Sequence, residues 1–383
     1  MAETRQPVRF NARAAYIFSD LPSYVRAKKT LPVLASLFHE VHFIGCRRRR
    51  SWDAGRPEGI HYHIDPRELG YGLGTIGGVL RFIGTIRRVL REVRPEVVIS
   101  VNEEYILPFT FGMLPRPRTL VLDLYDSIGM RITGPARRLN PLWRKLSETA
   151  MRTADGLVEV NEERLAWHRV VPRATAVVHN APPWIETITP MEGLPEPFLY
   201  VSGSLEDDLH GAEALLAALE KVPGMNIVFT GRALGPFVTG TFLKHPRVHN
   251  LGMIPYEDVL RVLAAARGLY NHTSPVRLNY IYGAPNKLYE AMMTGRPLLI
   301  NRENHAARLA EKHGFGLVAP YGDVEEIAAQ LRLLRDGAGE LSAACERARE
   351  AFREEYAWDR WAAVRWSELF LSLGVPVAEP AGA

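Results

Sequence analysis

The sequence has few cysteines and no long hydrophobic run. Cys46 and Cys345 are the only thiols among 383 residues, which excludes a disulfide framework of the kind that holds small secreted domains together. No apolar run approaches the roughly 18 residues that span a bilayer. The first thirteen residues, MAETRQPVRFNAR, also lack the apolar segment of a signal peptide. These absences predict a cytoplasmic protein.

Lysine is scarce as well, since the chain has 7 lysines against 40 arginines and a net charge of +4. The charge is unevenly distributed. Residues 1–190 contain 28 Lys and Arg against 19 Asp and Glu, whereas residues 191–383 contain 19 against 24. A basic first half suits nucleic acid, an anionic lipid surface or a phosphorylated ligand, and the sign alone does not choose among them.

The length predicts two domains, at roughly 150 residues each, and the pattern predicts an α/β fold. In the first half, short β-rich apolar runs alternate with helical patterns. One such helix should carry Ile76, Val79, Leu80, Ile83, Ile86 and Leu90 on a single face. The seven runs are AAYIFS, VHFIGC, HYHI, VVISV, TLVLDLY, GLVEV and TAVVH. Alternation of this kind indicates a parallel sheet with helices on both faces.

A second alternating set follows a proline-rich segment, HNAPPWIETITPMEGLPEP. Its six runs are FLYVSG, NIVFTG, VHNLG, GLYNHT, PLLIN and GLVAP, with helices expected near residues 211, 256, 286, 305 and 324 and a helical tail through Trp358, Trp361 and Trp366. The domains predicted are 1–183, a linker 184–196, a second domain 197–355, and a tail 356–383 that packs back on the first domain. Two such domains facing a cleft would bind ligands at the carboxyl ends of their strands.

Two short motifs favour ordinary structural roles. GLGTIG, from Gly72 to Gly77, matches the dinucleotide pattern but does not directly join a strand to a helix, so it is interpreted as a loop and helix start. Glu206-Asp207-Asp208 follows a strand, where it could bind a divalent cation. Asp208 is also suited to cap the next helix, and we favour the cap over a metal site.

The segment from Thr273 to Asn301, TSPVRLNYIYGAPNKLYEAMMTGRPLLIN, contains the strongest ligand signal. A loop with Gly283 leads into a helix near Asn286, whose free amides would bind a phosphate. Lys287 adds a positive charge, and Glu290, about one turn later, could accept hydrogen bonds from the two hydroxyls of a ribose. A carboxylate near a positive helix end is the structural alternative for Glu290.

The string PNKLYEAMMTGRPLL resembles the donor-site motif of glycosyltransferases of the GT-B fold, which has two Rossmann-like domains, and in particular the retaining family 4. Further similar segments are VSGSLEDDLHGAEALLAAL, VFTGRALGP, VHNLGMIPYEDVLRVLAAA, VLDLYDS, SETAMRTADGLVEVNEE and AVVHNAPP. The resemblance covers roughly residues 90–340 and is strongest from Phe198 to Asn301. It implies a nucleotide diphosphate sugar as donor and no metal or other cofactor.

The resemblance also implies roles for individual residues. Glu290 would bind the ribose, Lys287 and the backbone of Gly283 to Asn286 would hold the diphosphate, and Met253 with Ile254 would flank the base. The other donor-site residues are Gly203, Ser204, His210, Gly231, Arg232 and Arg277. The family's E-x7-E pattern would place at Tyr282 a carboxylate that contacts the donor sugar. Its usual basic pair on the first donor-domain loop is replaced by Ser204 and His210, so Arg277 is expected to supply charge.

On the acceptor side, the family has a histidine in a sequence similar to DxHD, where this chain has Asp123-Leu124-Tyr125-Asp126. Tyr125 occupies the histidine's place, and Asp126 becomes the candidate for contacting the donor sugar or the acceptor hydroxyl. A turn residue is the alternative for Asp126. Glu103 and Glu104, which follow the strand VVISV, are the alternative general bases if the enzyme inverts configuration.

The sequence therefore predicts a glycosyltransferase, retaining and independent of metal, with a saccharide, lipid-linked or small-molecule acceptor and no nucleic acid partner. The alternatives are a sugar-nucleotide epimerase or phosphorylase on the same fold, and a binding module without catalysis. Arginine-rich stretches at residues 47–50, 87–94 and 137–145 suit an anionic membrane surface. A peripheral position at the inner face of the membrane is thus expected, with solvated surface as the alternative.

Overall fold

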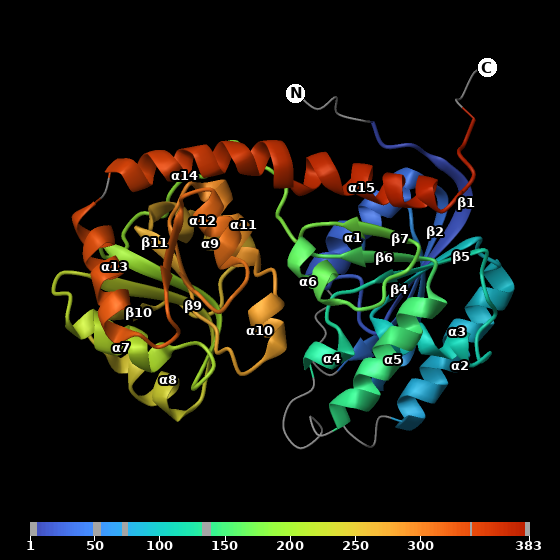
Figure 1. Cartoon of the computed structure of the whole chain (residues 1–383), viewed down its shortest axis with the longest axis horizontal. Coiled ribbons are helices and arrows are strands. Elements are labelled where there is room, and N and C mark those ends of the chain that lie inside the picture. The colour runs from blue at the N-terminus through green and yellow to red at the C-terminus, as the bar shows by residue number, and fades with distance from the viewer. Residues whose placement is uncertain (1–5, 49–54, 71–75, 132–138, 338, 380–383) are drawn as a thin grey trace. The chain divides into compact units, whose positions relative to one another are not determined.

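The computed structural model describes residues 6–48, 55–70, 76–131, 139–337 and 339–379, and its chain folds into two compact units (Figure 1). Unit 1 comprises Met1–His179 and Arg360–Ala383, and unit 2 comprises Asn180–Asp359. Each unit is built on one parallel sheet, of seven strands in unit 1 and six strands in unit 2. The predicted α/β class with two Rossmann-like sheets is confirmed.

In unit 1 the strands lie in the order β3-β2-β1-β4-β5-β6-β7, and every pair is parallel. All seven predicted runs form strands. The strands are β1 (Phe10–Phe18), β2 (Phe38–Arg48), β3 (His61–Leu69), β4 (Val97–Val101), β5 (Thr119–Asp123), β6 (Gly156–Glu159) and β7 (Ala174–Val177). The helices are α1 (Val25–Leu37), α2 (Ile76–Val93), η2 (Glu103–Tyr105), α3 (Leu107–Thr110), α4 (Ile128–Arg131), α5 (Asn140–Thr153) and α6 (Glu162–Trp167).

Helix α2 shows one difference from the predicted apolar face. Ile83, Ile86 and Leu90 are buried as expected, but Leu80 is 54% exposed. Phe82 and Val89 are buried instead, and Phe82 packs edge-on against the ring of Tyr105 with the ring centroids 5.4 Å apart. The buried stripe is therefore rotated relative to the prediction, because a single helix with apolar residues at adjacent positions fits more than one stripe. Residues 72–75 of the glycine-rich motif lie outside the described residues.

Unit 2 repeats the architecture with strand order β10-β9-β8-β11-β12-β13. Its strands are β8 (Phe198–Glu206), β9 (Asn226–Leu234), β10 (Val248–Asn250), β11 (Gly268–Asn271), β12 (Leu298–Asn301) and β13 (Gly316–Ala319). Its helices are α7 (Ala212–Glu220), α8 (Pro236–Gly240), η4 (Phe242–Lys244), α9 (Tyr256–Ala265), α10 (Leu278–Tyr282), α11 (Asn286–Thr294), α12 (Ala307–Lys312) and α13 (Val324–Asp336). The chain adds β9 and β10 on one side of β8, and then adds β11, β12 and β13 on the other side. Doubly wound sheets bind ligands at the position where this order switches, here between β8 and β11.

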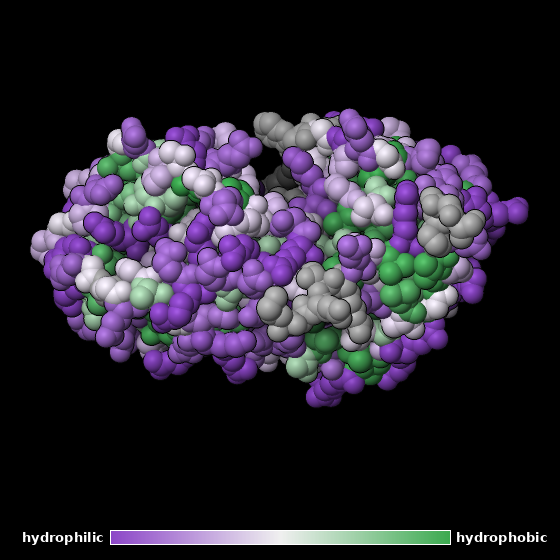
Figure 2. All heavy atoms as spheres, turned by 90° about the horizontal axis from the view of Figure 1, so that it is seen from above, coloured by the Kyte–Doolittle hydropathy of each residue, from purple (hydrophilic) through white to green (hydrophobic). Residues whose placement is uncertain are grey.

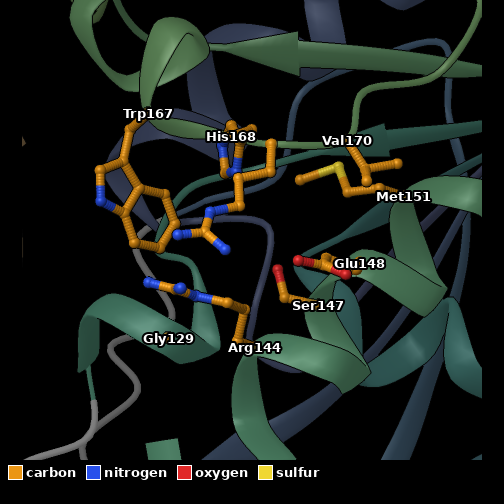
Figure 3. Close-up of a pocket in the computed structure, with 9 residues that line it drawn as sticks. Gly129, Arg144, Ser147, Glu148, Met151, Trp167, His168 and Val170 are labelled. Atoms are coloured by element: carbon orange, nitrogen blue, oxygen red, sulfur yellow. The ribbon is translucent and has the colours of Figure 1, made fainter. Parts of the chain in front are cut away.

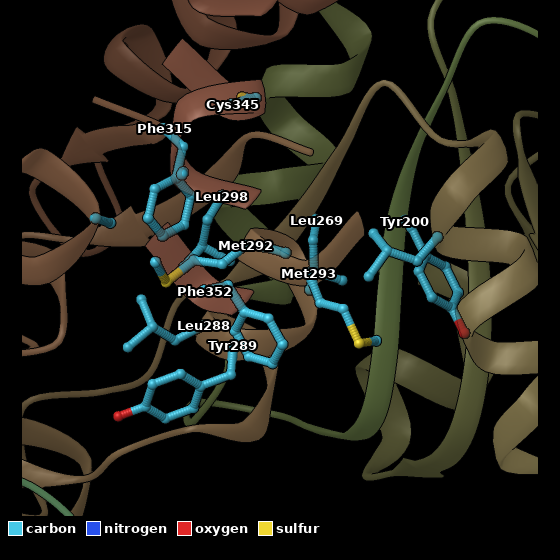
Figure 4. Close-up of a cluster of buried hydrophobic side chains, with 14 of the residues drawn as sticks. Tyr200, Leu269, Leu288, Tyr289, Met292, Met293, Leu298, Phe315, Cys345 and Phe352 are labelled. Atoms are coloured by element: carbon cyan, nitrogen blue, oxygen red, sulfur yellow. The ribbon is translucent and has the colours of Figure 1, made fainter. Parts of the chain in front are cut away.

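Helix α11 is anchored by the largest core of unit 2 (Figure 4). Leu288, Tyr289, Met292 and Met293 are at most 2% exposed and pack with side chains from β8, β11 and β12. The segment predicted as a linker also packs on this core through Trp184, Ile185, Ile188, Met191 and Leu194. It is therefore part of unit 2, because its apolar side chains bury surface that an open linker would leave in water.

The carboxyl-terminal helices form a run of α14 (Gly339–Ala351), a π-helical turn η5 (Phe352–Tyr356) and α15 (Trp358–Ser372). The helix α14 was not among the predicted elements. Within unit 1, Phe370 on α15 lies edge-on to Phe10 and Phe38 at centroid distances of 5.6 and 4.9 Å. Val377 forms a bridge with Phe10, so α15 belongs to the hydrophobic core of unit 1.

Across the described residues, no helix combines the length and the apolar character needed to cross a membrane. The face seen in Figure 2 is largely hydrophilic, with separate patches of exposed apolar side chains.

We expect Phe370→Ala to lower the free energy of unfolding of unit 1 by about 3–5 kcal/mol, because it removes a fully buried ring from between two aromatic neighbours. Leu371→Ala, at a side chain that is 42% exposed, is the matched control and should have a small effect. Chemical denaturation of both variants measures the difference, and equal losses would show that α15 is not held by this ring.

Candidate functional site

The strand ends of β8 and β9 meet through two glycines. Gly203 and Gly231 are register partners and have φ values of +85° and +128°. A Cβ on Gly231 would lie 1.9 Å from the carbonyl oxygen of Gly203, so no other residue fits there without moving the strand. The Gly231 amide donates to the carbonyl of Gly252 at 2.8 Å. The loop that carries Met253 and Ile254 is thereby held beside the two strand ends.

Three basic side chains influence one another next to these glycines. The side chain of Lys287, in the first turn of α11, reaches Gly203, since a Cβ there would lie 3.9 Å from the Lys287 Cε. Burial lowers the pKa of Lys287 to about 8, although Glu290 nearby opposes the shift. Burial lowers the pKa of His210 to about 4, and the charges of Lys287 and Arg277 add to that shift. Among the described residues, neither Lys287 nor Arg277 has a carboxylate within ion-pair distance. An anion would relieve this concentration of positive charge.

His210 is a neutral hydrogen-bond donor in this arrangement. Its Nδ1 accepts the amide hydrogen of Glu206 at 3.1 Å, so the proton of the neutral ring is on Nε2. The imidazole ring of His210 packs against the ring of Tyr280, with the two centroids 5.7 Å apart. The Arg277 guanidinium lies 5.4 Å from the centroid of the Tyr280 ring. Tyr280 therefore positions both the histidine and the arginine.

Glu290 lies one turn further along α11 and is 5% exposed. Its Oε1 accepts a hydrogen bond from the Tyr256 hydroxyl at 3.1 Å, and burial raises the pKa of Tyr256. Tyr256 is itself 50% exposed, and Met253 is 74% exposed. A carboxylate that contacts a half-exposed tyrosine ring suits a ligand with hydroxyl groups and a flat apolar part. Ile254 is half-buried against the core of unit 2.

The amino-terminal end of α11 has no side-chain cap, and its N-cap residue is Pro285. Asn286, the first helical residue, accepts a hydrogen bond from Asn180. In the preceding loop, a Cβ on Gly283 would lie 2.4 Å from the Asn279 carbonyl oxygen, so the close turn requires glycine. Tyr282 packs its ring edge-on against His305 at 4.4 Å. The helix therefore presents free backbone donors, and an aromatic side chain stands where the resemblance implies a carboxylate.

The remaining predicted residues lie at the same sheet edge. Ser204 and Arg232 are register partners one position beyond the glycine pair. Ser204 is half-buried, whereas Arg232 is exposed.

The predicted capping role of Asp208 is wrong. Helix α7 begins after Gly211 without a side-chain cap, and Asp208 is exposed with φ at +61°. Asp207 is the capping residue, and it caps another helix, because its carboxylate accepts from the amides of Phe237 and Val238 at 2.8 Å each. Neighbouring strands bring α8 beside the loop, which the local sequence could not show. Within the described part of the chain, no group of three acidic, histidine or cysteine side chains could hold a metal ion.

Two tyrosines hold the loop that carries His210. The Tyr321 hydroxyl donates to the Asp208 carbonyl and accepts from the Gly211 amide, both at 3.1 Å. The Tyr270 hydroxyl donates to the Gly211 carbonyl at 3.1 Å. Tyr321 follows β13 and Tyr270 lies in β11, so the loop after β8 is held from two other strands. These hydrogen bonds hold the backbone on both sides of His210.

In unit 1, a buried ion pair determines the position of the segment that contains Asp126. Arg26 Nη2 lies 3.0 Å from Asp123 Oδ1, and both side chains are at most 4% exposed. Tyr16 donates to Asp123 at 2.9 Å and its hydroxyl lies 2.5 Å from that of Tyr125. Burial raises the pKa of Asp123, and Arg26 opposes that shift. Removing either partner would leave a buried charge unpaired, which is strongly destabilising.

Asp126 follows this network and is half-buried. Its amide and that of Tyr125 both donate to Asn102 Oδ1, at 3.0 and 2.9 Å. Asn102 itself adopts φ of +61°, an uncommon conformation for a residue other than glycine. Tyr125 is 9% exposed and stacked on Tyr24, so of the two candidate positions only Asp126 presents a side chain at the surface.

Glu103 does not fit the predicted role of general base. It is 0% exposed, and its carboxylate accepts from the hydroxyls of Ser127 and Ser147 at 2.7 and 2.8 Å and from the amide of Ile128. Burial raises its pKa, with Glu104 contributing. Its function in this fold is to hold α4 and α5 against the end of β4. Glu104 is half-buried beside it.

A small pocket of about 30 Å³ lies between α5 and the residues at the end of α6, and it is lined by Ser147, which donates to Glu103 (Figure 3). Arg144, Ser147 and Glu148 point into it from α5, opposite Trp167 and His168. His168 is held by Glu159, with Nε2 2.7 Å from Oε1. The pocket has room for about one water molecule and combines an indole face with charged groups of both signs.

Comparison with known proteins agrees with this geometry. The family model described as glycosyl transferase-like matches residues 210–364. Sucrose-phosphate synthase from Thermosynechococcus elongatus has a similar structure, with a TM-score of 0.74 and 14% identity over 94% of this chain and 99% of that chain. The chain has the GT-B fold. No curated protein matches its sequence significantly.

Two further solved structures share this GT-B fold. The Anabaena protein HepE, in complex with UDP and glucose, matches with a TM-score of 0.67 and 14% identity over 94% of this chain and all of that chain. WaaG, a glycosyltransferase involved in lipopolysaccharide biosynthesis, matches with a TM-score of 0.63 and 16% identity over 91% of this chain and 98% of that chain. At these identities the likeness concerns the fold.

Sequence reasoning missed several residues that organise the site of this GT-B chain. Tyr256 contacts Glu290, and Asn180 contacts Asn286. Tyr270 and Tyr321 bond to the backbone of residues on either side of His210. No local motif marks a tyrosine whose hydroxyl serves a loop 110 residues away. Gly252 could have been identified from the sequence, because it directly precedes the predicted site residue Met253 in a short loop after a predicted strand.

We expect Tyr321→Phe to raise the pKa of His210 from about 4 toward the ordinary value of about 6.5. The variant frees the loop, and a more hydrated ring charges more easily. The loss of the hydroxyl should also lower the free energy of unfolding by about 1 kcal/mol. Titration of the His210 ring protons by NMR measures the shift. Tyr62→Phe, which removes a hydroxyl bonded to the Pro57 carbonyl in unit 1, is the control and should leave that pKa unchanged.

Proposed function

We propose that this protein is a glycosyltransferase that transfers a sugar from a nucleoside diphosphate sugar to an acceptor bound by unit 1. The observation that carries the proposal is the cationic edge of unit 2. There Lys287, Arg277 and a neutral His210 surround two glycines and the uncapped start of α11. Helix amides and positive side chains of this kind stabilise a departing diphosphate. HepE in complex with UDP and glucose supports UDP-glucose as the first donor to test.

Each donor-site residue has a proposed role. Glu290, oriented by Tyr256, binds the ribose hydroxyls, and Met253 with Ile254 flank the base. Lys287, Arg277, His210 and Ser204 contact the phosphates. The backbone at Gly203, Gly231 and Gly283 to Asn286 allows their close approach, and Arg232 lines the outer rim. The Tyr256 hydroxyl donates to Glu290 Oε1. That tyrosine therefore holds the carboxylate in the orientation in which the ribose meets it.

The transfer is proposed to retain configuration and to need no metal. The bond between the sugar's anomeric carbon and the diphosphate breaks, and the acceptor oxygen bonds to the same face of that carbon. The acceptor proton passes to the departing phosphate oxygen, so no separate base is needed. If the enzyme inverts instead, Asp126 or Glu104 would take that proton, directly or through one water. Glu103 is not proposed for that role, because its buried carboxylate already accepts hydrogen bonds from Ser127, Ser147 and Ile128.

A saccharide or lipid-linked acceptor suits the basic first half, with the protein in the cytoplasm at the inner face of a membrane. Two parts of the charge pattern behind this proposal, residues 49–50 and 137–138, lie outside the described residues. Arg87, Arg88, Arg91, Arg94, Arg144 and Lys145 are all exposed, which is what attraction to anionic headgroups requires.

A second candidate function rests on Tyr282. An aromatic ring packed on His305 does not accept the sugar hydroxyls as a carboxylate would, and this departure permits a sugar-nucleotide epimerase or phosphorylase on the same fold. Incubation with donor alone separates the two, because an epimerase changes the donor without an acceptor and a phosphorylase consumes it with phosphate. Transfer to an acceptor that persists with a metal chelator would support the primary proposal. Binding of UDP without any turnover would indicate a binding module.

We expect Glu290→Ala to weaken UDP binding about ten- to a hundredfold, since a hydrogen bond to a charged group contributes about 1.5–3 kcal/mol. Calorimetry measures the dissociation constant. Glu346→Ala, at an exposed carboxylate on α14, is the control. An affinity unchanged in a folded Glu290→Ala protein would remove Glu290 from the ribose site.

For Lys287 we expect UDP-glucose affinity to fall as the pH rises. A lysine with a pKa of about 8 is mostly charged at about pH 7 and about one-tenth charged at about pH 9, so the affinity should drop up to about tenfold. In Lys287→Ala the affinity should be low and nearly independent of pH. Lys287→Ala should also weaken UDP far more than uridine, and equal losses for both would place Lys287 outside the phosphate site.

A further inference from the structure

A second basic site lies at the opposite end of the unit 1 strands from Asp126. The carboxyl-terminal end of α2 and residues 115–118 line a trough of about 540 Å³, beside the first residues of β4 and β5. Its charged lining consists of Arg91, Arg94, Arg116 and Arg118, together with Glu96. A neighbouring shallow depression shares Arg91 and adds Arg87 and Arg88, together with Glu92, whose Oε1 lies 3.6 Å from Arg88 Nη1. The volume is within the range of small-molecule sites.

The acidic side chain that lines the trough does not neutralise the positive charge of its arginines. Glu96 is already engaged by Arg13, whose amide donates to Oε2 at 2.8 Å and whose guanidinium lies 3.7 Å from Oε1. Arg116 pairs with Asp155 at 2.9 Å. For the other three arginines of the lining, the described residues offer no carboxylate within ion-pair distance. Three exposed guanidinium groups with one common opening favour a ligand with several negative oxygens.

The backbone around these arginines is restricted. Pro95, Pro115 and Pro117 all line the trough, and proline holds φ near −65° and restricts the residue before it. Arg94 directly follows the last residue of α2 and has φ at +49°, a position where glycine is the usual residue. A site whose backbone is already ordered pays less entropy when it binds a ligand.

We propose that this trough binds a ligand with two or more phosphate groups, separately from the nucleotide site of unit 2. Planar guanidinium groups bind phosphate oxygens in pairs. The phosphates could belong to one soluble phosphorylated compound or to neighbouring headgroups of anionic lipids, and the chemistry of recognition is the same for both. The site does not depend on the proposed transferase activity.

The test titrates the full chain with inorganic tripolyphosphate in the presence of UDP, and repeats the titration in Lys287→Ala protein, in which the phosphate site of unit 2 is weakened. Flotation with phosphatidylcholine vesicles, with and without phosphatidylglycerol, forms the second arm. The test variant is Arg94→Ser/Arg118→Ser. The matched control is Arg9→Ser/Arg173→Ser, which removes two exposed arginines of unit 1 that do not line the trough.

We expect the test variant to bind tripolyphosphate at least about tenfold more weakly than the wild type, to float less with phosphatidylglycerol vesicles, or both, and the control to behave as the wild type. Loss in the titration alone assigns a soluble phosphorylated ligand, and loss of flotation assigns lipid headgroups. A test variant that matches the control in both arms overturns the proposal. UDP affinity should be unchanged in both variants. A failure of the proposed donor site would appear in the UDP measurement, and a failure of the trough proposal would appear in the tripolyphosphate and flotation measurements.

Discussion

Uncompensated positive charge at the carboxyl edge of the unit 2 sheet is the constraint on which the candidate site depends. Lys287 is half-buried beside two glycines, and its lowered pKa shows that the fold bears a cost for holding an ammonium group there. The large apolar core under α11 offsets this cost, because Leu288, Tyr289, Met292 and Met293 anchor the helix in unit 2. One face of α11 therefore packs in the core and stabilises unit 2, while Lys287 at the start of the same helix belongs to the candidate binding site.

The glycine pair makes this edge accessible. At Gly203 and Gly231 the two strands approach so closely that a side chain on Gly231 would overlap the neighbouring carbonyl. At Gly203 no side chain separates the backbone from Lys287, so a phosphate bound there could contact the backbone directly. Tyr270 and Tyr321 then hold the adjoining loop, so that His210 reaches the same opening as a neutral donor.

Much of the architecture could be predicted from the chain. All thirteen strands were predicted from short apolar runs separated by helical patterns. The position of Lys287 and Glu290 in the first turns of α11 was predicted from the helix start near Asn286. The errors have a common physical origin. Asp208 was assigned the cap of α7, which begins without a side-chain cap, whereas its neighbour Asp207 caps α8. Glu103 was assigned the role of a base, although its carboxylate is buried in a hydrogen-bond network. In both cases the partner comes from another element: α8 binds Asp207, and α4 with α5 surrounds Glu103.

By itself, the sequence determined the fold class, the order of elements and the residue types available at each strand end, because hydrophobic periodicity and helix spacing are local properties. The tertiary structure decided which of those residues share a site and in what state. Burial lowers the pKa of Lys287 and His210, Tyr256 orients Glu290, and Arg26 fixes the segment before Asp126. These effects depend on distances of a few ångströms between residues up to a hundred positions apart, and no local pattern encodes such distances.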